Sequence, residues 1–135
     1  MNRLTREWVR KAEADYCGAR QLQNSPEPVH DLVCFHCQQL VEKYMKALLE
    51  ESGSVVPRTH DLDRLLSLLD SAFPSITKFK RGLLFLSRHA VDTRYPGENA
   101  TRRQAVTALR WAERIRVECR SLLKIKPNER RSRLL

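Results

Sequence analysis

Residues 32–49 are the segment that most constrains how this chain can fold. Twelve of these eighteen residues are apolar, while polar residues recur at steps of three and four. On a helix this spacing places the polar side chains along one narrow edge and apolar side chains almost everywhere else, which is typical of the central helix of a bundle. The edge is either a solvent-exposed seam or part of a site. Its members are His36, Gln39, Lys43, Lys46 and Glu50.

The composition favours an all-α fold. A chain of 135 residues is long enough for one domain with one hydrophobic core. Four glycines and six prolines supply few of the turns that an all-β fold needs, whereas good helix formers are common. We therefore predict an all-α protein with a single domain over residues 1–123.

Five helices are predicted from apolar spacing and helix breakers. The first runs from Thr5, as its N-cap, to Gln23, and the second from about residue 29 to Glu51. A short helix follows the capping residues 59–61, and a fourth covers residues 75–90. The side chains expected inside are Trp8, Ala12, Tyr16, Ala19 and Leu22, then Leu62, Leu65, Leu66 and Leu69, then Ile76, Phe79, Leu83, Leu84 and Leu86.

The last helix begins after a turn-rich loop at residues 92–99, which contains Pro96 and Gly97. Thr101 and Gln104 have the spacing of a capping box. Small residues on the inner face predict close antiparallel packing onto earlier helices. Residues 124–135 are expected to form a basic, flexible tail. The inner face consists of Ala105, Ala108, Ala112, Ile115, Cys119 and Leu122.

Positive charge is concentrated in the last helix and the tail. The formal net charge is +9, and residues 101–135 contain eleven Lys and Arg against three Glu, an excess of eight. Such a surface suits a polyanion such as RNA or DNA, and the alternative is a solvated face that pairs with an acidic protein or with nothing. The candidate nucleic-acid contacts are Arg102, Arg103, Arg110 and Arg114, with Arg116 and Arg120 beside them.

No targeting, membrane-spanning or complete zinc motif is recognised in the sequence. The chain begins with no signal-peptide pattern and contains no apolar run of membrane-spanning length, so we expect a cytoplasmic protein without a membrane partner. Cys34 and Cys37 have a zinc-like spacing, but a four-ligand site needs a second pair, and both lie on the apolar face of the helix. We expect them to pack in the core, and we expect no metal or cofactor.

Several motifs together resemble the HEPN domain family. The carriers are the segment from Cys34 to Leu49, a following Pro57-x-x-His60-x-Leu62, and Arg94-Tyr95-Pro96-Gly97 before the last helix. The resemblance covers about residues 5–123. It implies an up-and-down antiparallel bundle of four to five helices, commonly a homodimer, and often paired with a minimal nucleotidyltransferase as toxin and antitoxin.

Many members of this family are ribonucleases, and the sequence departs from their motif. That motif is an Arg and a His separated by four to six residues near the start of the last long helix, in acid/base and phosphate roles. Here no His follows Arg94, and Arg81 and His89 are separated by seven residues within the fourth helix. Whether the protein is an enzyme stays open, and the missing motif favours a non-enzyme.

In the resemblance, Arg94 and Tyr95 occupy the functional loop of the family. The guanidinium of Arg94 would grip a phosphate bidentately, while Tyr95 stacks or donates a hydrogen bond. The central helix would contribute His36, Gln39 and Lys43 to the same ligand.

The alternative to this ligand site is purely structural. In that reading Arg94 pairs with Glu42, Asp92 or Glu98, and Tyr95 packs against Trp8 or Trp111. His60 is expected to make a hydrogen bond at the start of the third helix.

The preferred hypothesis is therefore a HEPN-like module that contacts a nucleotide, RNA or a nucleotidyltransferase partner. A metal-independent ribonuclease with a non-standard acid and base, and a purely structural partner-binding subunit, are the two alternatives. RNA cleavage and the salt dependence of binding would separate the three.

Overall fold

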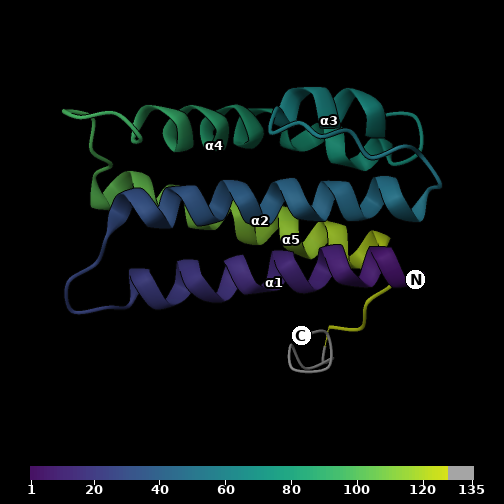
Figure 1. Cartoon of the computed structure of the whole chain (residues 1–135), viewed down its shortest axis with the longest axis horizontal. Coiled ribbons are helices and arrows are strands. Elements are labelled where there is room, and N and C mark those ends of the chain that lie inside the picture. Colours follow the sequence, from purple (N-terminus) through teal and green to yellow (C-terminus); the bar gives the residue numbers. More distant parts are fainter. Residues whose placement is uncertain (128–135) are drawn as a thin grey trace.

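The computed structural model describes residues 1–127, in which five α-helices and one 3₁₀ helix form a bundle without strands. Successive long helices run in opposite directions, so that α5 is antiparallel to α1 and α4 (Figure 1). Its main partner is α2, which runs the same way, so the antiparallel packing predicted for the last helix is wrong for this contact. The predicted all-α, up-and-down bundle is confirmed. The elements are α1 Arg3–Gln23, α2 His30–Glu51, α3 Leu62–Leu69, η1 Pro74–Phe79, α4 Lys80–Asp92 and α5 Arg102–Leu122.

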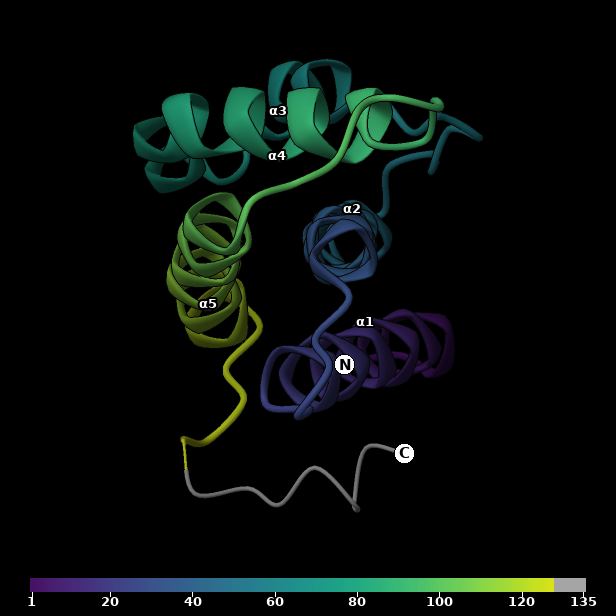
Figure 2. The ribbon, with the colours of Figure 1, turned by 90° about the vertical axis from the view of Figure 1, so that its left-hand side faces the viewer.

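Helix α2 lies at the centre of the bundle, as its apolar pattern predicts. It packs against α1, α3, α4 and α5, and Figure 2 shows it with α1, α4 and α5 around it. Cys34 and Cys37 are both buried in the core, which confirms the packing role predicted for them. Burial raises the pKa of Cys34 to about 11 and raises that of Cys37 further, so both thiols stay protonated.

Helix α1 begins earlier than predicted, because Asn2 and not Thr5 is its N-cap. The Asn2 side chain accepts a hydrogen bond from the backbone N–H of Thr5 at 2.8 Å, which satisfies one of the free donors of the first turn. Ala12 and Ala19 are buried as predicted, whereas the larger aromatic side chains of this helix are only partly covered. Two acidic residues of α1, Glu13 and Asp15, are buried as well.

The fourth predicted helix is divided into η1 and α4. The tighter 3₁₀ turn places residues three apart directly above one another, so that Ile76 and Phe79 both enter the core. Pro74 at the first position supplies the fixed φ angle that starts this turn. Leu84 was expected inside but is 55% exposed, because it lies one residue off the stripe formed by Leu83 and its neighbours.

Helix α5 starts with the predicted capping box, in which Thr101 and Gln104 bond each other's backbone N–H. It packs closely on α4: a Cβ added to Gly82 would lie 2.5 Å from the Trp111 ring. Beyond the helix, Ile125 is buried against the core, so packing continues past residue 123. Residues 128–135, most of the predicted tail, lie outside the described residues. No helix within residues 1–127 is long and apolar enough to cross a membrane.

Candidate functional site

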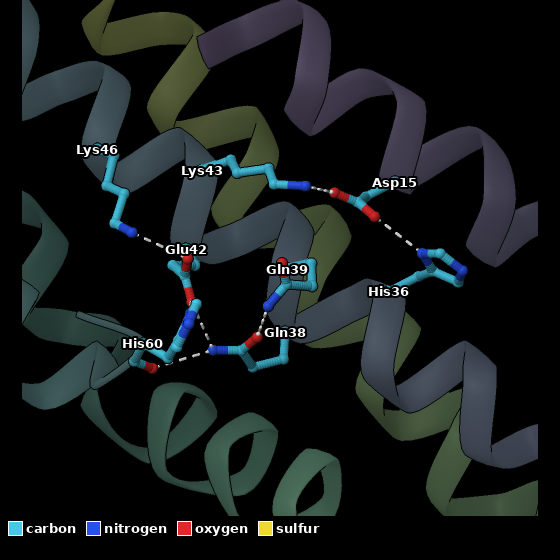
Figure 3. Close-up of polar contacts among 8 residues, drawn as sticks. All are labelled: Asp15, His36, Gln38, Gln39, Glu42, Lys43, Lys46 and His60. Atoms are coloured by element: carbon cyan, nitrogen blue, oxygen red, sulfur yellow. Dashed lines mark hydrogen bonds and ion pairs between the residues drawn. The ribbon is translucent and has the colours of Figure 1, made fainter. Parts of the chain in front are cut away.

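The polar edge of α2 is not a solvent seam, because its lysines pair with carboxylates. Figure 3 shows two groups of contacts along this edge. In the first, the Lys43 ammonium lies 2.6 Å from Asp15 Oδ2, and His36 Nδ1 lies 2.8 Å from Asp15 Oδ1. We call these three residues the Asp15 cluster. It ties α2 to α1 and balances the charge of a buried carboxylate.

The second group joins α2 to the segment before α3. Lys46 Nζ donates to Glu42 Oε2 at 3.0 Å, and His60 Nδ1 lies 2.9 Å from Glu42 Oε1. Gln38 Nε2 donates to the same carboxylate at 3.3 Å and to the backbone carbonyl of His60 at 3.2 Å. Gln39 donates to Gln38 Oε1 at 2.8 Å. The Glu42 cluster is defined as Gln38, Glu42, Lys46 and His60.

His60 turns one ring nitrogen inward and leaves the other accessible. An ionised carboxylate only accepts hydrogen bonds, so the contact with Glu42 places a proton on Nδ1. The His60 side chain is 78% exposed, and Nε2 is therefore the nitrogen available to a ligand. The helix-start role expected for His60 is wrong, because Asp61 caps α3 by accepting from the N–H groups of Asp63 and Arg64.

Arg94 lies between two hollows on the surface where α4 meets α2. One hollow has a volume of about 430 Å³ and the other about 330 Å³, and Ala90 and Arg94 border both. The larger is also lined by Val29, Asp31, Leu32, Phe35 and Thr93, and the smaller by Gln38, His60, Asp61, Ser87 and Val91.

The guanidinium of Arg94 has no carboxylate within ion-pairing distance among residues 1–127. The structural alternative, in which it pairs with Glu42, Asp92 or Glu98, is therefore wrong, and the Glu42 carboxylate is already bonded to Lys46, His60 and Gln38. Arg94 instead stands 5.5 Å from the centre of the Phe35 ring. Its hydrogen-bond donors are available at the rim of both hollows.

The five predicted ligand residues are not gathered around one cavity. His36 and Lys43 meet at Asp15, Gln39 lies between the two clusters, and Arg94 lies beside the Glu42 cluster. Tyr95 is 65% exposed, so it does not pack against Trp8 or Trp111, and it lines neither hollow. The role of these residues in ligand binding stays a prediction.

The arginines of α5 do not all face outward as predicted. Arg102, Arg103 and Arg110 are exposed, and Arg114 is exposed with its guanidinium 4.9 Å from the centre of the Trp111 ring. The expectation that Arg116 and Arg120 lie beside them on the surface is wrong.

Both arginines turn inward to Glu13 of α1, which is fully buried. Arg116 donates two hydrogen bonds of 2.7 Å to the Glu13 carboxylate, and Arg120 Nη1 lies 3.6 Å from Oε1. Tyr44 donates its hydroxyl proton to Glu13 Oε2 at 2.6 Å. These four residues, the Glu13 cluster, join α1, α2 and α5.

The Glu13 cluster stays charged because its hydrogen bonds outweigh the cost of burial. Burial by itself would raise the pKa of Glu13, but the hydrogen bonds from Arg116 and Tyr44 and the charges of both arginines lower it below the ordinary value. Burial, followed by the neighbouring Glu13 charge, raises the pKa of Tyr44, so its hydroxyl remains protonated. The cluster thus contains one negative charge and two positive charges.

A family model for the HEPN domain matches residues 5–122. The chain belongs to the HEPN domain family. Membership places it among modules related to nucleotides and RNA. No curated protein and no solved structure matches the chain significantly, so the assignment rests on the family model.

The acidic residues that organise this HEPN domain were not predicted from the sequence. Glu13 had a usable signal, because it lies four residues after Val9 and three before Tyr16, on the side of α1 that faces the core. Glu42 also had a local signal, because it lies four residues before Lys46 on the predicted second helix, which is the spacing of an ion pair. No local pattern predicts that His60 also contacts Glu42, because the chain between α2 and α3 determines where His60 lies.

Proposed function

We propose that this HEPN domain binds a phosphate-bearing ligand, a nucleotide or RNA, at the two hollows that meet at Arg94. The observation that carries the proposal is the exposed guanidinium of Arg94, which lacks a carboxylate partner among the described residues and borders both hollows. A guanidinium in this state offers planar paired donors that match two phosphate oxygens.

The two hollows differ in chemistry in a way that suits a nucleotide. The larger has an apolar floor that includes Val29, Leu32 and Phe35, which fits the flat face of a base. The smaller contains His60 and Ser87, which fit the hydroxyl groups of a sugar or further phosphate oxygens. Each hollow is of the size that small-molecule sites commonly have.

Binding is tested by fluorescence anisotropy of a labelled short RNA, with AMP as competitor, at two salt concentrations. The variant Arg94→Gln should weaken binding roughly tenfold or more, because a charge-assisted hydrogen bond contributes about 1.5–3 kcal/mol. The matched control is Arg88→Gln. Arg88 is an exposed arginine as well; it lies on α4, six residues before Arg94, and lines neither hollow.

The control separates a specific contact from general attraction by positive charge. We expect Arg88→Gln to change the affinity by less than about threefold at moderate salt, because an exposed charge away from the ligand acts only through a screened field. Equal losses in both variants would contradict a site at Arg94. A site at Arg94 would also be contradicted if AMP displaced RNA equally well from the wild type and from Arg94→Gln.

A second candidate function, metal-independent RNA cleavage, is favoured by the contact between Glu42 and His60. Glu42 orients the imidazole so that Nε2 faces outward, as in catalytic pairs where a carboxylate fixes the histidine tautomer. In such a reaction Nε2 would accept the proton of a ribose 2′-hydroxyl as that oxygen attacks phosphorus. The bond from phosphorus to the 5′-oxygen would break, the leaving 5′-oxygen would take a proton from water, and Arg94 would hold the phosphate oxygens.

Cleavage is tested by incubating the purified protein and mixed RNA in the presence of EDTA. If the second candidate is right, His60→Ala and Arg94→Ala abolish cleavage while His89→Ala does not, because His89 stacks near Phe85 and lines neither hollow. If the protein binds RNA without cleaving it, binding is its function and the ribonuclease hypothesis is wrong.

Partners are proposed on the surface around the same hollows. Leu84 and Val91 lie two helical turns apart on α4, and both are about half exposed, as is Tyr95 just beyond the helix. These side chains support the proposal of a homodimer or of a nucleotidyltransferase bound to this surface. Light scattering of the purified chain, with Leu84→Gln and Val91→Gln together as the variant, tests the homodimer.

A further inference from the structure

The Glu13 cluster contains one more positive charge than its carboxylate can balance. Glu13 already has a bidentate partner in Arg116 and a third hydrogen bond from Tyr44. Arg120 adds a second guanidinium, and its side chain is only 8% exposed. Two guanidiniums share one carboxylate, and a largely buried surplus charge is costly, so the surplus favours a bound anion nearby.

The unused donors of Arg120 point to where that anion would bind. Only Nη1 has partners among the described residues: the Glu13 carboxylate at 3.6 Å and the Tyr44 hydroxyl at 3.3 Å. Arg120 also lines a hollow of about 520 Å³ at the end of α5, and its other two guanidinium nitrogens have no hydrogen-bond partner among residues 1–127. A nearly buried guanidinium with spare donors beside a cavity is a prepared anion site.

Among residues 1–127, the charged residues that line this hollow are all basic. They are the exposed Lys124 and Lys126 and the largely buried Arg116 and Arg120. Cations near a helix C-terminus complement the helix dipole, which by itself accounts for the two lysines. The dipole does not account for a second guanidinium buried beneath them.

The backbone at the rim is held in an unusual conformation. Lys124 has a φ angle of 60°, which lies in the left-handed region that residues other than glycine and asparagine rarely adopt. The turn is fixed by the backbone bond from Ile125 N–H to the carbonyl of Arg120 at 2.9 Å. A lysine at this strained position supplies a charge at the mouth of the hollow, which a glycine would not.

We propose that this hollow is a second anion site, which takes a phosphate group between Arg120, Lys124 and Lys126. Val117 and Ile125 supply apolar lining for an uncharged part of the ligand. The site is separate from the hollows at Arg94: the end of α5 lies on the side of α1, whereas α4 covers the opposite side of α2 (Figure 2). The phosphate group can belong to free phosphate, to a nucleotide or to an RNA backbone.

The test measures the affinity of the full chain for three probes: inorganic phosphate, AMP and a short RNA. The variant is Lys124→Asn with Lys126→Gln, because asparagine tolerates the left-handed conformation and both side chains are exposed, so the fold is retained. The affinity of the site for phosphate should fall at least tenfold. The control, Lys80→Gln with Arg81→Gln on α4, removes the same charge from another exposed surface and should change it by less than twofold.

Nuclear magnetic resonance of the arginine side chains locates the anion. We expect phosphate to shift the Nε–Hε signal of Arg120 in the wild type and in Arg94→Gln alike, which separates this site from the proposed function. If AMP or RNA binds here more tightly than phosphate, the ligand is a nucleotide or RNA. No shift of the Arg120 signal at millimolar phosphate, or equal losses in the variant and the control, would overturn the proposal.

The chain's own acidic residue outside the described range is tested separately. Glu129 lies three residues after Lys126, and the variant Glu129→Gln removes its charge. We expect no change in phosphate affinity. A rise of tenfold or more would show that Glu129 itself neutralises Arg120, and would overturn the proposal of a ligand site.

Discussion

The two buried glutamates of this bundle, Glu13 and Glu42, are held in opposite ways. Glu13 is enclosed by three helices and carries two guanidiniums and a tyrosine hydroxyl. Glu42 has one ammonium partner, and its other main partner is a histidine that reaches solvent. Glu13 joins three helices inside the core, whereas Glu42 positions the His60 side chain at the edge of the smaller hollow.

The two clusters therefore have different roles: the Glu13 cluster holds helices together, and the Glu42 cluster positions a surface residue. Each partner of Glu13 comes from a helix, so its geometry is fixed by the packing of α1, α2 and α5. His60 comes from the segment before α3 and is largely exposed, so its removal leaves the core intact. We therefore expect substitutions in the Glu13 cluster to change stability, and those of His60 and Arg94 to change ligand binding.

The largest effect is expected from Glu13→Gln. It leaves Arg116 and Arg120 without a carboxylate in the core, and breaking a buried ion pair costs about 3–5 kcal/mol. Glu42→Gln should cost about 2 kcal/mol, because Lys46 keeps its contact with the Trp8 ring and His60 is solvated. Urea unfolding followed by circular dichroism measures both.

Equal costs for the two glutamates would contradict the comparison. A further check is Glu13→Gln in high phosphate. If the hollow at Arg120 takes anions, phosphate should stabilise Glu13→Gln more than it stabilises Glu42→Gln, because Glu42→Gln retains the Glu13 charge that competes with a bound anion.

A second, smaller effect on stability concerns the packing of α4 on its two sides. Helix α4 leaves hollows where it faces α2 but packs closely on α5 at Gly82, where a Cβ would lie 2.5 Å from Trp111. Gly82→Ala should therefore destabilise the bundle by about 1–3 kcal/mol, although alanine is the better helix former. Gly18→Ala is the matched control, because its Cβ would make ordinary 3.7 Å contacts with His36.

The control should stabilise the protein by roughly 0.5–1 kcal/mol, since alanine restricts the unfolded chain and clashes with nothing. Thermal unfolding monitored by calorimetry gives the sign of both changes. A stabilising Gly82→Ala would mean that α4 can move away from α5.

Acid should unfold the wild type through the Glu13 cluster. The pKa of Glu13 is lowered below its ordinary value of 4.5 in the folded protein, so its stabilising contribution is present above that pH. The contribution is lost as the pH falls from about 4.5 through the lower folded pKa. Glu13→Gln should flatten the dependence of unfolding free energy on pH in this range, as measured by urea titrations at a series of pH values.

The smallest effect on stability is expected from His60→Ala. Its hydrogen bond to Glu42 comes from a side chain that is 78% exposed, and such exposed polar contacts contribute at most about 1 kcal/mol. Gln38 continues to donate to Glu42 in the variant. A loss well above this in urea unfolding would place His60 among the structural residues and remove the contrast with Glu13.

Local patterns were sufficient to predict most of the helices. The apolar run of α2, the capping box at Thr101 and the breakers between helices each depend on a few neighbouring residues. Errors arose where the chain adopts a less common local form. Asn2 replaced Thr5 as a cap, and the segment from Pro74 formed a 3₁₀ turn.

The candidate site was harder to predict because it depends on residues distant in the sequence. Arg94 was predicted from the resemblance to the HEPN family. Its neighbour at the smaller hollow, His60, lies 34 positions earlier and is brought there by the path of the chain between α2 and α3. Arg116 and Arg120 looked like surface charges because their partner, Glu13, lies on the first helix. A count of charges along one helix does not reveal which of them the fold turns inward.

The central claim, that the surface at Arg94 binds phosphate-bearing ligands, is tested most directly by an NMR titration of isotope-labelled protein with AMP. The account predicts saturable shifts at Phe35, His60, Ser87 and Arg94, and the loss of these shifts in Arg94→Gln while the spectrum stays folded. Shifts confined to the exposed arginines of α5, or the same shifts at Phe35 and His60 in Arg94→Gln, would contradict it.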